Sequence, residues 1–203
     1  METFRVVISG VGGQGTLLAS RILAEASIKA GFSVKIGETY GMAQRGGPVM
    51  GHIQIGGKAY NPQIRKGEAD ALVAFEPAEA TRRGVTYLKE DGLALVNSRI
   101  TAPVEVISGM VTYPAMSDLI SLLNKVTKKV ISFDATKLAE EAGDSIATNV
   151  VMLGALSMSG VLPYGEEILV KTLEDSLHPR FLDLNMRAFN LGKKALKKIL
   201  IFM

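Results

Sequence analysis

The residue types best suited to chemistry gather in two glycine-rich segments of this 203-residue chain. The first runs Gly10-Val11-Gly12-Gly13-Gln14-Gly15, between an apolar strand-like run and a helix-like run. Glycines permit a tight turn there, and the N–H groups that open the following helix attract an anion. The G-x-G-x-x-G spacing therefore predicts an anion-binding loop made of Gly10, Gly12, Gly13, Gln14, Gly15 and Thr16.

Two interpretations of this loop stay open. In a dinucleotide site, Glu38 would stand about where an acid binds the ribose. That fingerprint does not call for a polar amide inside the turn, so Gln14 argues against it. The alternative is that the glycines only let the first helix pack closely on the sheet.

The second segment, Gly37–Pro48, carries an acid, an aromatic ring, amide and hydroxyl groups, an arginine and several glycines. We expect an irregular loop at the same end of the sheet as the first segment, where the carboxyl ends of strands meet ligands and partners. In the plainest structural interpretation, Arg45 pairs with Glu38. The candidate interface or active-site residues are Glu38, Tyr40, Gly41, Gln44, Arg45, Gly46 and Gly47.

Short apolar runs alternate with helical stretches along the whole chain, which is typical of a mostly parallel sheet covered by helices. We therefore predict an α/β fold with three layers (α/β/α), a Rossmann-like sheet and a helical C-terminal portion, as one domain over residues 1–203. The predicted strands are Phe4–Ser9, Phe32–Ile36, Val49–Ile55, Ala71–Phe75, Leu93–Val96 and Val130–Phe133, with Val104–Ile107 and Met110–Tyr113 as weaker candidates. The predicted helices are Thr16–Ala30, Pro77–Gly84, Met116–Val126, Ala135–Ala142, Asn149–Ser159, Glu166–Leu173 and Phe181–Leu200.

Composition excludes several classes of protein. The chain has no cysteine, which rules out disulfides, thiol catalysis and iron–sulfur ligation by this chain. Its two histidines, His52 and His178, are far apart, which argues against a histidine-based metal site, and we expect no metal. His52 falls in a predicted strand, where a histidine is more often structural than catalytic, so we assign no catalytic residue. The net charge of +3 comes from four lysines near the C-terminus, and aromatic residues are only 6% of the chain, so a nucleic-acid partner is not expected.

Neither the N-terminus nor the longest uncharged stretch predicts a membrane protein. The N-terminus, Met1–Arg5, runs directly into a strand-like segment and lacks the pattern of a signal peptide. The longest uncharged stretch, residues 145–165, contains several polar residues, glycines and a proline, which favours a buried helix over a membrane span. We expect a soluble, cytoplasmic protein.

Taken together, the two segments resemble the gamma-type subunit of the 2-oxoacid:ferredoxin oxidoreductases. The string Glu38-Thr39-Tyr40-Gly41-Met42-Ala43-Gln44-Arg45-Gly46-Gly47 is most similar to the indolepyruvate branch, although Tyr40 and Pro48 stand where histidine and serine are common there. The resemblance covers essentially the whole chain in order. It continues through Leu18–Ala24, His52, Glu68-Ala69-Asp70, Ala71–Phe75 with Glu76-Pro77, Asp134-Ala135, Asn149 and Leu153-Gly154-Ala155.

The resemblance implies a partner chain. Enzymes of the indolepyruvate branch convert an arylpyruvate and coenzyme A to an aryl-acetyl-CoA and CO2, and they reduce ferredoxin with thiamine diphosphate, magnesium and iron–sulfur clusters. These cofactors are expected on a large, cysteine-rich alpha subunit. The present chain would complete that enzyme and be inactive alone, with the Gly10–Thr16 loop as a phosphate loop for coenzyme A.

Three alternatives remain. The chain is a gamma subunit for another 2-oxoacid (pyruvate, 2-oxoglutarate or a branched-chain acid), an independent nicotinamide- or flavin-binding protein, or a scaffold without a ligand whose glycine loops only shape an interface. In isolation, a homodimer is a further state to test.

Overall fold

The computed structural model describes residues 2–41, 46–57 and 61–202. The described residues form a six-stranded sheet in the order β2-β3-β1-β4-β5-β6. Strands β1, β4, β5 and β6 pair in parallel, whereas β3 runs antiparallel to both of its neighbours, β1 and β2. The strands are β1 (Phe4–Val11), β2 (Val34–Tyr40), β3 (Pro48–Ile55), β4 (Ala69–Ala74), β5 (Leu88–Asn97) and β6 (Lys129–Phe133).

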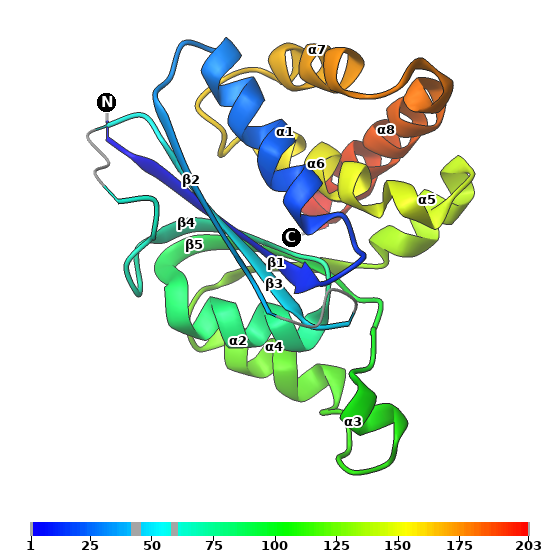
Figure 1. Cartoon of the computed structure of the whole chain (residues 1–203). Helices are drawn as coiled ribbons and strands as arrows, with labels where there is room; N and C mark the ends of the chain where they lie inside the picture. Colours follow the sequence, from blue (N-terminus) through cyan, green and yellow to red (C-terminus); the bar gives the residue numbers. More distant parts are fainter. Residues whose placement is uncertain (1, 42–45, 58–60, 203) are drawn as a thin grey trace.

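Helices cover both faces of this sheet (Figure 1). One face packs against α1 (Thr16–Lys29), α5 (Ala135–Ala142), α6 (Thr148–Met158), α7 (Glu166–Ser176) and α8 (Pro179–Ile201), and the other against α2 (Pro77–Tyr87) and α4 (Met116–Asn124). A short helix, α3 (Val104–Ile107), and a 3-10 turn, Ser145–Ala147, complete the set. The predicted three-layer, mostly parallel α/β fold is therefore confirmed.

The residues of β1 show why the sheet is a middle layer. Val6 and Ile8 point to the side of α1 and α6, while Val7 points to the side of α2, and all three are fully buried. A strand buried on both faces has a continuous apolar sequence instead of an alternating one. The apolar run Phe4–Ser9 follows that rule, and the strand predicted there is the main part of β1.

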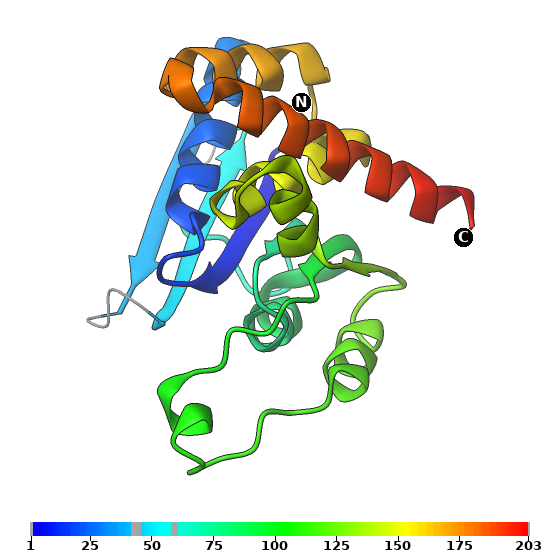
Figure 2. The same ribbon diagram turned by 90° about the vertical axis from the view of Figure 1, so that its right-hand side faces the viewer.

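The helical C-terminal portion is held by close contact between α6 and α8, which pack together on the face of the sheet that α1 covers (Figure 2). Gly154 on α6 lies directly on the backbone of Phe189, and Gly192 on α8 lies on the backbone of Val151. A methyl group at either glycine would fall inside van der Waals contact with those backbone atoms. Gly154 and Gly192 therefore allow the close packing of α6 and α8 within this chain.

Three predicted segments were assigned wrongly. Residues Gly37–Tyr40, expected in a loop, are the second half of β2 and pair with Val49–His52 of β3. A polar, glycine-containing run carries no strand pattern of its own, and the neighbouring strand supplies the hydrogen bonds that fix it. Val104–Ile107, a weak strand candidate, is the helix α3, and Met110–Tyr113 forms no strand. Short apolar runs are ambiguous by periodicity.

The helix that begins at Pro77 is longer than predicted, because it passes through Gly84 and ends at Tyr87. Gly84 is fully packed: a methyl group there would collide with the side chain of Leu123 on α4. This glycine allows two helices to approach and does not end the first one. Among the described residues, no helix combines the length and the apolar character needed to cross a bilayer.

Candidate functional site at the carboxyl edge of the sheet

The carboxyl edge is the end of the sheet where β1, β2, β4, β5 and β6 finish, at Val11, Tyr40, Ala74, Asn97 and Phe133. The first glycine segment turns there between β1 and α1. Gly10 is still part of β1 and pairs with Val49, so the loop proper is residues 12–15, which corrects the predicted start. Gly13 and Gly15 have φ of 104° and 75°, a region that favours glycine.

The start of α1 offers donors to an anion. Gly15 is the N-cap residue and gives no side-chain cap, so the first N–H groups of the helix have no acceptor within it. The Thr16 side chain is buried, and its Oγ1 has no hydrogen-bond partner among the described residues. A helix N-terminus attracts negative charge through these N–H groups and the helix dipole.

Gln14 fixes the shape of the turn from inside. Its Oε1 accepts a hydrogen bond from the N–H of Val11 at 2.9 Å. Its Nε2 donates to the carbonyl of Phe75 at 3.2 Å and to Oγ1 of Thr101 at 3.1 Å. The Gln14 amide, which a dinucleotide fingerprint does not call for, therefore ties the loop to Phe75, directly after β4, and to Thr101, in the segment that follows β5.

The two glycine segments meet, as the sequence predicted. The N–H of Gly12 donates to the carbonyl of Gly47 at 2.8 Å, and the N–H of Gly46 donates to the carbonyl of Gly12 at 3.2 Å. Two predicted residues of the second segment, Gln44 and Arg45, lie outside the described residues. The predicted partnership of Arg45 with Glu38 therefore stays a prediction.

Glu38 and Tyr40 lie on β2, not on a loop, which corrects the prediction for both. Nε of Arg21, on α1, lies 3.6 Å from Oε1 of Glu38. The antiparallel strand β3 separates β2 from β1, so Glu38 is one strand further from the glycine loop than the acid of a dinucleotide fold. One strand is about 5 Å of lateral distance.

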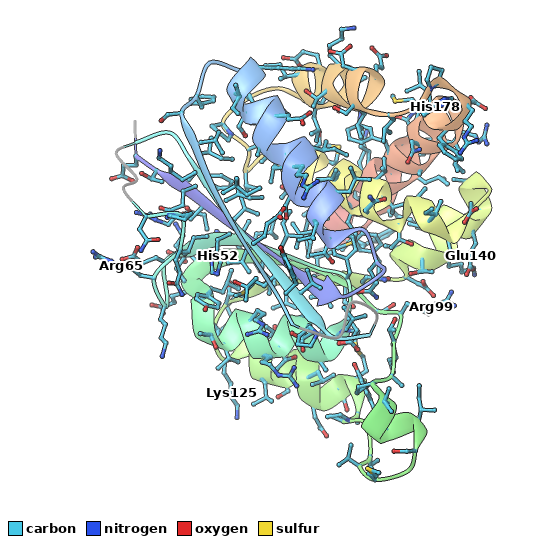
Figure 3. All side chains as sticks on the ribbon, in the orientation of Figure 1. His52, Arg65, Arg99, Lys125, Glu140 and His178 are labelled. Atoms are coloured by element: carbon cyan, nitrogen blue, oxygen red, sulfur yellow. The ribbon has the colours of Figure 1, made fainter. Side chains whose placement is uncertain are left out.

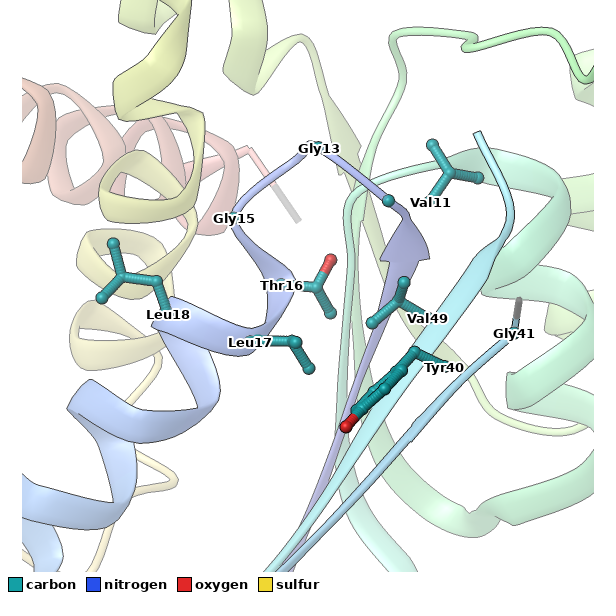
Figure 4. Close-up of a pocket in the computed structure, with 10 residues that line it drawn as sticks. Val11, Gly13, Gly15, Thr16, Leu17, Leu18, Tyr40, Gly41 and Val49 are labelled. Atoms are coloured by element: carbon teal, nitrogen blue, oxygen red, sulfur yellow. The ribbon is translucent and has the colours of Figure 1, made fainter. Parts of the chain in front are cut away.

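A pocket of about 370 Å³ opens beside the glycine loop (Figure 4). Gly41 and the exposed ring of Tyr40 bound it on the side of β2, and Leu17 and Thr16 bound it on the side of α1. Its walls combine apolar side chains with the N–H groups of the loop. Such a site accepts a ligand that has both an apolar part and an anionic part.

A second pocket, of about 320 Å³, lies on the other side of Gly13 and Gln14. Hydroxyl groups line it, and Arg99 adds a positive charge. Nη2 of Arg99 pairs with Asp134 at 3.2 Å and with Glu140 at 3.4 Å (Figure 3). These acids neutralise the guanidinium, and the hydrogen bond from Arg99 to Asp134 raises the arginine pKa. The hydroxyl residues are Thr101, Thr136, Ser145 and Thr148.

A buried acid at this edge was missed by sequence analysis. Glu76 caps α2: it is 2% exposed, and its Oε2 accepts a hydrogen bond from the N–H of Glu79 at 2.9 Å. The hydroxyl of Tyr113 donates to Oε1 of Glu76 and accepts from the N–H of Ala78 at 3.1 Å. Burial raises the pKa of both Glu76 and Tyr113. The signal available was an acid directly before Pro77 at a helix start.

Asn97, the last residue of β5, is a second buried polar residue at this edge that the sequence analysis did not identify. It is fully buried; its Nδ2 donates to the carbonyl of Phe75 and to Thr136, and its Oδ1 accepts from the N–H of Ala135 at 2.9 Å. Gln14 and Asn97 thus share the carbonyl of Phe75. These hydrogen bonds connect the ends of β1, β4, β5 and β6 at the carboxyl edge.

His52 was predicted to be structural and lies buried on β3, in the interior of the molecule (Figure 3). Its Nδ1 accepts from the N–H of Ile64 at 3.4 Å, and its ring meets that of Tyr87 edge-on at 5.0 Å. Burial, and then the positive charge of Arg83, lower the pKa of His52. These contacts hold residues 61–64 against the sheet, away from the carboxyl edge.

The fold and this edge define a Rossmann-like α/β protein whose glycine loop offers backbone donors next to a pocket. The chain belongs to the pyruvate ferredoxin/flavodoxin oxidoreductase family, whose model matches residues 5–195. The resemblance found in the sequence is confirmed, and so is its assignment to an oxidoreductase subunit.

Two relatives show how far the similarity reaches. The chain is 42% identical to indolepyruvate oxidoreductase subunit IorB of Thermococcus kodakarensis, over 98% of this chain and 99% of the relative. It is 28% identical to a pyruvate oxidoreductase subunit of known structure from Thermotoga maritima, with a TM-score of 0.69 and coverage of 96% and 97%.

A third protein shares the fold at 19% identity, with a TM-score of 0.70. It is the 2-oxoglutarate:ferredoxin oxidoreductase of Magnetococcus marinus, whose structure has 2-oxoglutarate, coenzyme A and succinyl-CoA bound. The match covers 98% of the present chain but only 32% of that protein's chain. In that protein, the same fold is one part of a much longer polypeptide.

Proposed function

We propose that this chain is the small subunit of an indolepyruvate oxidoreductase, as one gamma-type domain over residues 1–203. The observation that carries the proposal is the 42% identity, over nearly the full length of both chains, to a subunit of that name. The complete enzyme would convert an arylpyruvate, coenzyme A and oxidised ferredoxin to aryl-acetyl-CoA, CO2, a proton and reduced ferredoxin. Two electrons leave the oxoacid as its carboxylate is lost.

The residues of this chain do not fit the cofactors of that reaction. A chain without cysteine has no thiolate to hold an iron–sulfur cluster. Among the described residues, no three acidic or histidine side chains come together where they would hold a metal ion. We therefore assign thiamine diphosphate, magnesium and the clusters to a large, cysteine-rich subunit, which also passes electrons to ferredoxin.

The carboxyl edge is the part of this chain proposed to serve the reaction, by binding coenzyme A. The N–H groups of the glycine loop and of the first turn of α1 would hold phosphate oxygens, helped by Thr16 Oγ1. The apolar wall of the 370 Å³ pocket would hold a less polar part of the same molecule. The second segment, with Arg45, would face either coenzyme A or the large subunit.

A nicotinamide or flavin protein is less well supported by this geometry. The turn is filled by Gln14, and β3 holds Glu38 away from the glycine loop. A subunit for another 2-oxoacid remains compatible with the family, and the relative from Thermotoga maritima carries the name of a pyruvate enzyme. Substrate choice therefore has to be measured.

The proposal is tested on the complex purified from native cells, with a panel of 2-oxoacids, coenzyme A and a viologen dye as electron acceptor. We expect the highest kcat/KM with indolepyruvate or another arylpyruvate, and no activity or visible cofactor spectrum in the isolated chain. Preference for pyruvate or 2-oxoglutarate would move the chain to another branch. Micromolar binding of NADH, NADPH or FAD to the isolated chain would contradict the subunit assignment.

A further inference from the structure

A further pocket at the carboxyl edge, of about 530 Å³, has no part in the proposed function, and we call it the α2 pocket. It lies on the face of the sheet that α2 covers, whereas α1 bounds the proposed coenzyme A pocket on the other face. Ligands of open α/β sheets bind at this edge, where the helices after two neighbouring strands leave on opposite faces, as α1 and α2 do after β1 and β4. The volume is in the range of pockets that hold small organic molecules.

The floor and one wall of the α2 pocket are apolar. Val11 of β1 and Pro48 of β3 stand directly opposite each other in the antiparallel ladder, so their side chains point to the same face of the sheet. Val7, four residues before Val11 on β1, packs in the core beneath α2, which places the pair on that side. Val104 and Val111, after β5, also line the pocket and are 74% and 55% exposed. The apolar part of a ligand would remove these surfaces from water.

The charged residues that line the α2 pocket differ in exposure. Glu76 is 2% exposed, and its carboxylate accepts hydrogen bonds from Tyr113 and from the N–H of Glu79. The Glu79 side chain is 4% exposed and pairs with both Arg82 and Arg83. The Arg82 side chain is 60% exposed, and among the described residues only its Nη1 is hydrogen-bonded. The exposed charge in this pocket is therefore a guanidinium that a buried acid holds in place.

A guanidinium beside apolar walls limits the class of ligand. Its planar fork donates two parallel hydrogen bonds to a carboxylate, and its face stacks on an aromatic ring. The two acids, Glu76 and Glu79, already have donors and are buried, so they are not available to hold a cation. A molecule with an aromatic ring and a carboxylate matches both the apolar walls and the guanidinium.

Hydrogen bonds hold the walls of the α2 pocket together without a ligand. The hydroxyl of Tyr113 donates to Glu76 and accepts from the N–H of Ala78, which joins the segment between α3 and α4 to the start of α2. On the other side, the N–H of Gly12 donates to the carbonyl of Gly47, which also lines the pocket. A preformed pocket reduces the entropy lost on binding.

From these observations we propose that the α2 pocket binds an aromatic carboxylate, with the ring on its apolar walls and the carboxylate on the guanidinium of Arg82. The inference goes beyond the proposed function and does not depend on it. If the proposed function holds, arylpyruvates and arylacetates both belong to this class of ligand. The chain would then hold such an acid at a site separate from the glycine loop.

The test uses indole-3-acetate as the probe and the whole isolated chain as the protein. The chain contains no tryptophan, so indole fluorescence comes from the probe alone and its anisotropy measures binding. We expect a Kd below about 1 mM, a range that a ligand of this size reaches in a preformed pocket. Indole and acetate, which each carry one half of the probe, should bind at least tenfold more weakly.

Two pairs of variants test the assignment to the α2 pocket. Arg82→Gln removes the exposed guanidinium, while Arg83 keeps its pair with the buried acid at 3.3 Å. Arg65→Gln is its control, because Arg65 is 86% exposed and lies before β4, at the opposite edge of the sheet (Figure 3).

The second pair lies on α3. Val104→Asp puts an acid into the wall of the pocket, and Ile107→Asp is its control, because Ile107 is 75% exposed on the same short helix and does not line the pocket. We expect Arg82→Gln and Val104→Asp to raise the Kd at least tenfold, and the two controls to change it less than about twofold. All four substitutions are at exposed side chains, so Tm should stay within about 2 °C of the wild type.

The other outcomes overturn the proposal. No saturable binding by the wild type would refute the site and leave the proposed function, which is tested on the complex, as it is. An unchanged Kd in Arg82→Gln and Val104→Asp would place the probe elsewhere on the chain. Equal weakening by either control would show that the attraction is not specific to this pocket. Equal affinity for indole and indole-3-acetate would refute the contact between the carboxylate and Arg82.

Discussion

Tyr113 gives the sharpest test of how the carboxyl edge is built. In the wild type, its hydroxyl donates to the buried carboxylate of Glu76 and accepts from the N–H of Ala78. Tyr113→Phe keeps the ring and removes both hydrogen bonds. Glu76 then keeps the backbone N–H groups of Glu79 and Ala78 as its described donors, and a buried acid with fewer donors destabilises the folded state.

The magnitude follows from the charge of the acceptor. A hydrogen bond to a charged group contributes about 1.5–3 kcal/mol to the free energy of unfolding. For a chain of this length, each kcal/mol changes Tm by about 2–4 °C, so we expect Tyr113→Phe to lower Tm by about 3–12 °C. Thermal unfolding followed by circular dichroism measures this. Tyr40→Phe is the control: its ring is 65% exposed, and its loss of a hydroxyl should change the free energy of unfolding by less than about 0.5 kcal/mol.

The effect should also depend on pH in one direction. Burial raises the pKa of Glu76 above its ordinary 4.5, and the hydrogen bond from Tyr113 opposes that rise. The ionised carboxylate needs the donor most, so the destabilisation by Tyr113→Phe should grow as pH increases from 4.5 to 8. A Tm loss below 1 °C, or one that is equal at both pH values, would refute the role given to Tyr113 and Glu76.

Three further predictions concern other parts of the molecule. Because the pKa of His52 is lowered in the folded state, the unfolded chain takes up its proton first, and the free energy of unfolding should fall as pH drops below about 6.5. Urea unfolding of the wild type at pH 7.5 and 5.5 should show this fall, and an equal fall in His52→Asn would contradict it. Gly192→Ala should lower the free energy of unfolding by about 1–3 kcal/mol, because a methyl group there meets the backbone of Val151. Gly41→Ala, at a position with open space around it, should leave the free energy of unfolding unchanged, and equal stability of the two variants would be inconsistent with this packing. Arg45→Lys should leave Tm nearly unchanged but raise the KM for coenzyme A, or the Kd of assembly, at least tenfold, because lysine cannot reproduce a two-point guanidinium contact. If neither the KM for coenzyme A nor the Kd of assembly changes, Arg45 is not part of the site.

Prediction from sequence succeeded where one segment carries its own pattern. The uninterrupted apolar run of β1 and the apolar periodicity of α1 are local signals, and both elements were found within two residues of their true ends. Prediction failed at Gly37–Tyr40, because the ladder with β3 makes that segment a strand. It also failed at Val104–Ile107, where four apolar residues fit a strand as well as a helical turn.

The candidate site divides in the same way. The glycine spacing alone located the loop between β1 and α1, and the sequence predicted that the second segment would lie beside it. Glu76 and Tyr113 are 37 residues apart, and nothing in either local sequence indicates their contact. Only the folded structure, which brings the start of α2 and the segment between α3 and α4 together, reveals the pair.

The sequence by itself determined the class of fold, the position of the glycine loop and the family, because those depend on local residue patterns and on an ordered set of motifs. The tertiary structure alone decided what Gln14 does, since its partners Phe75 and Thr101 follow β4 and β5 and are 61 and 87 residues away in the sequence. It also decided that β3 lies between β1 and β2, which removes Glu38 from a dinucleotide geometry. Strand order is fixed by packing between distant segments, and a pattern read along one segment carries no record of that packing.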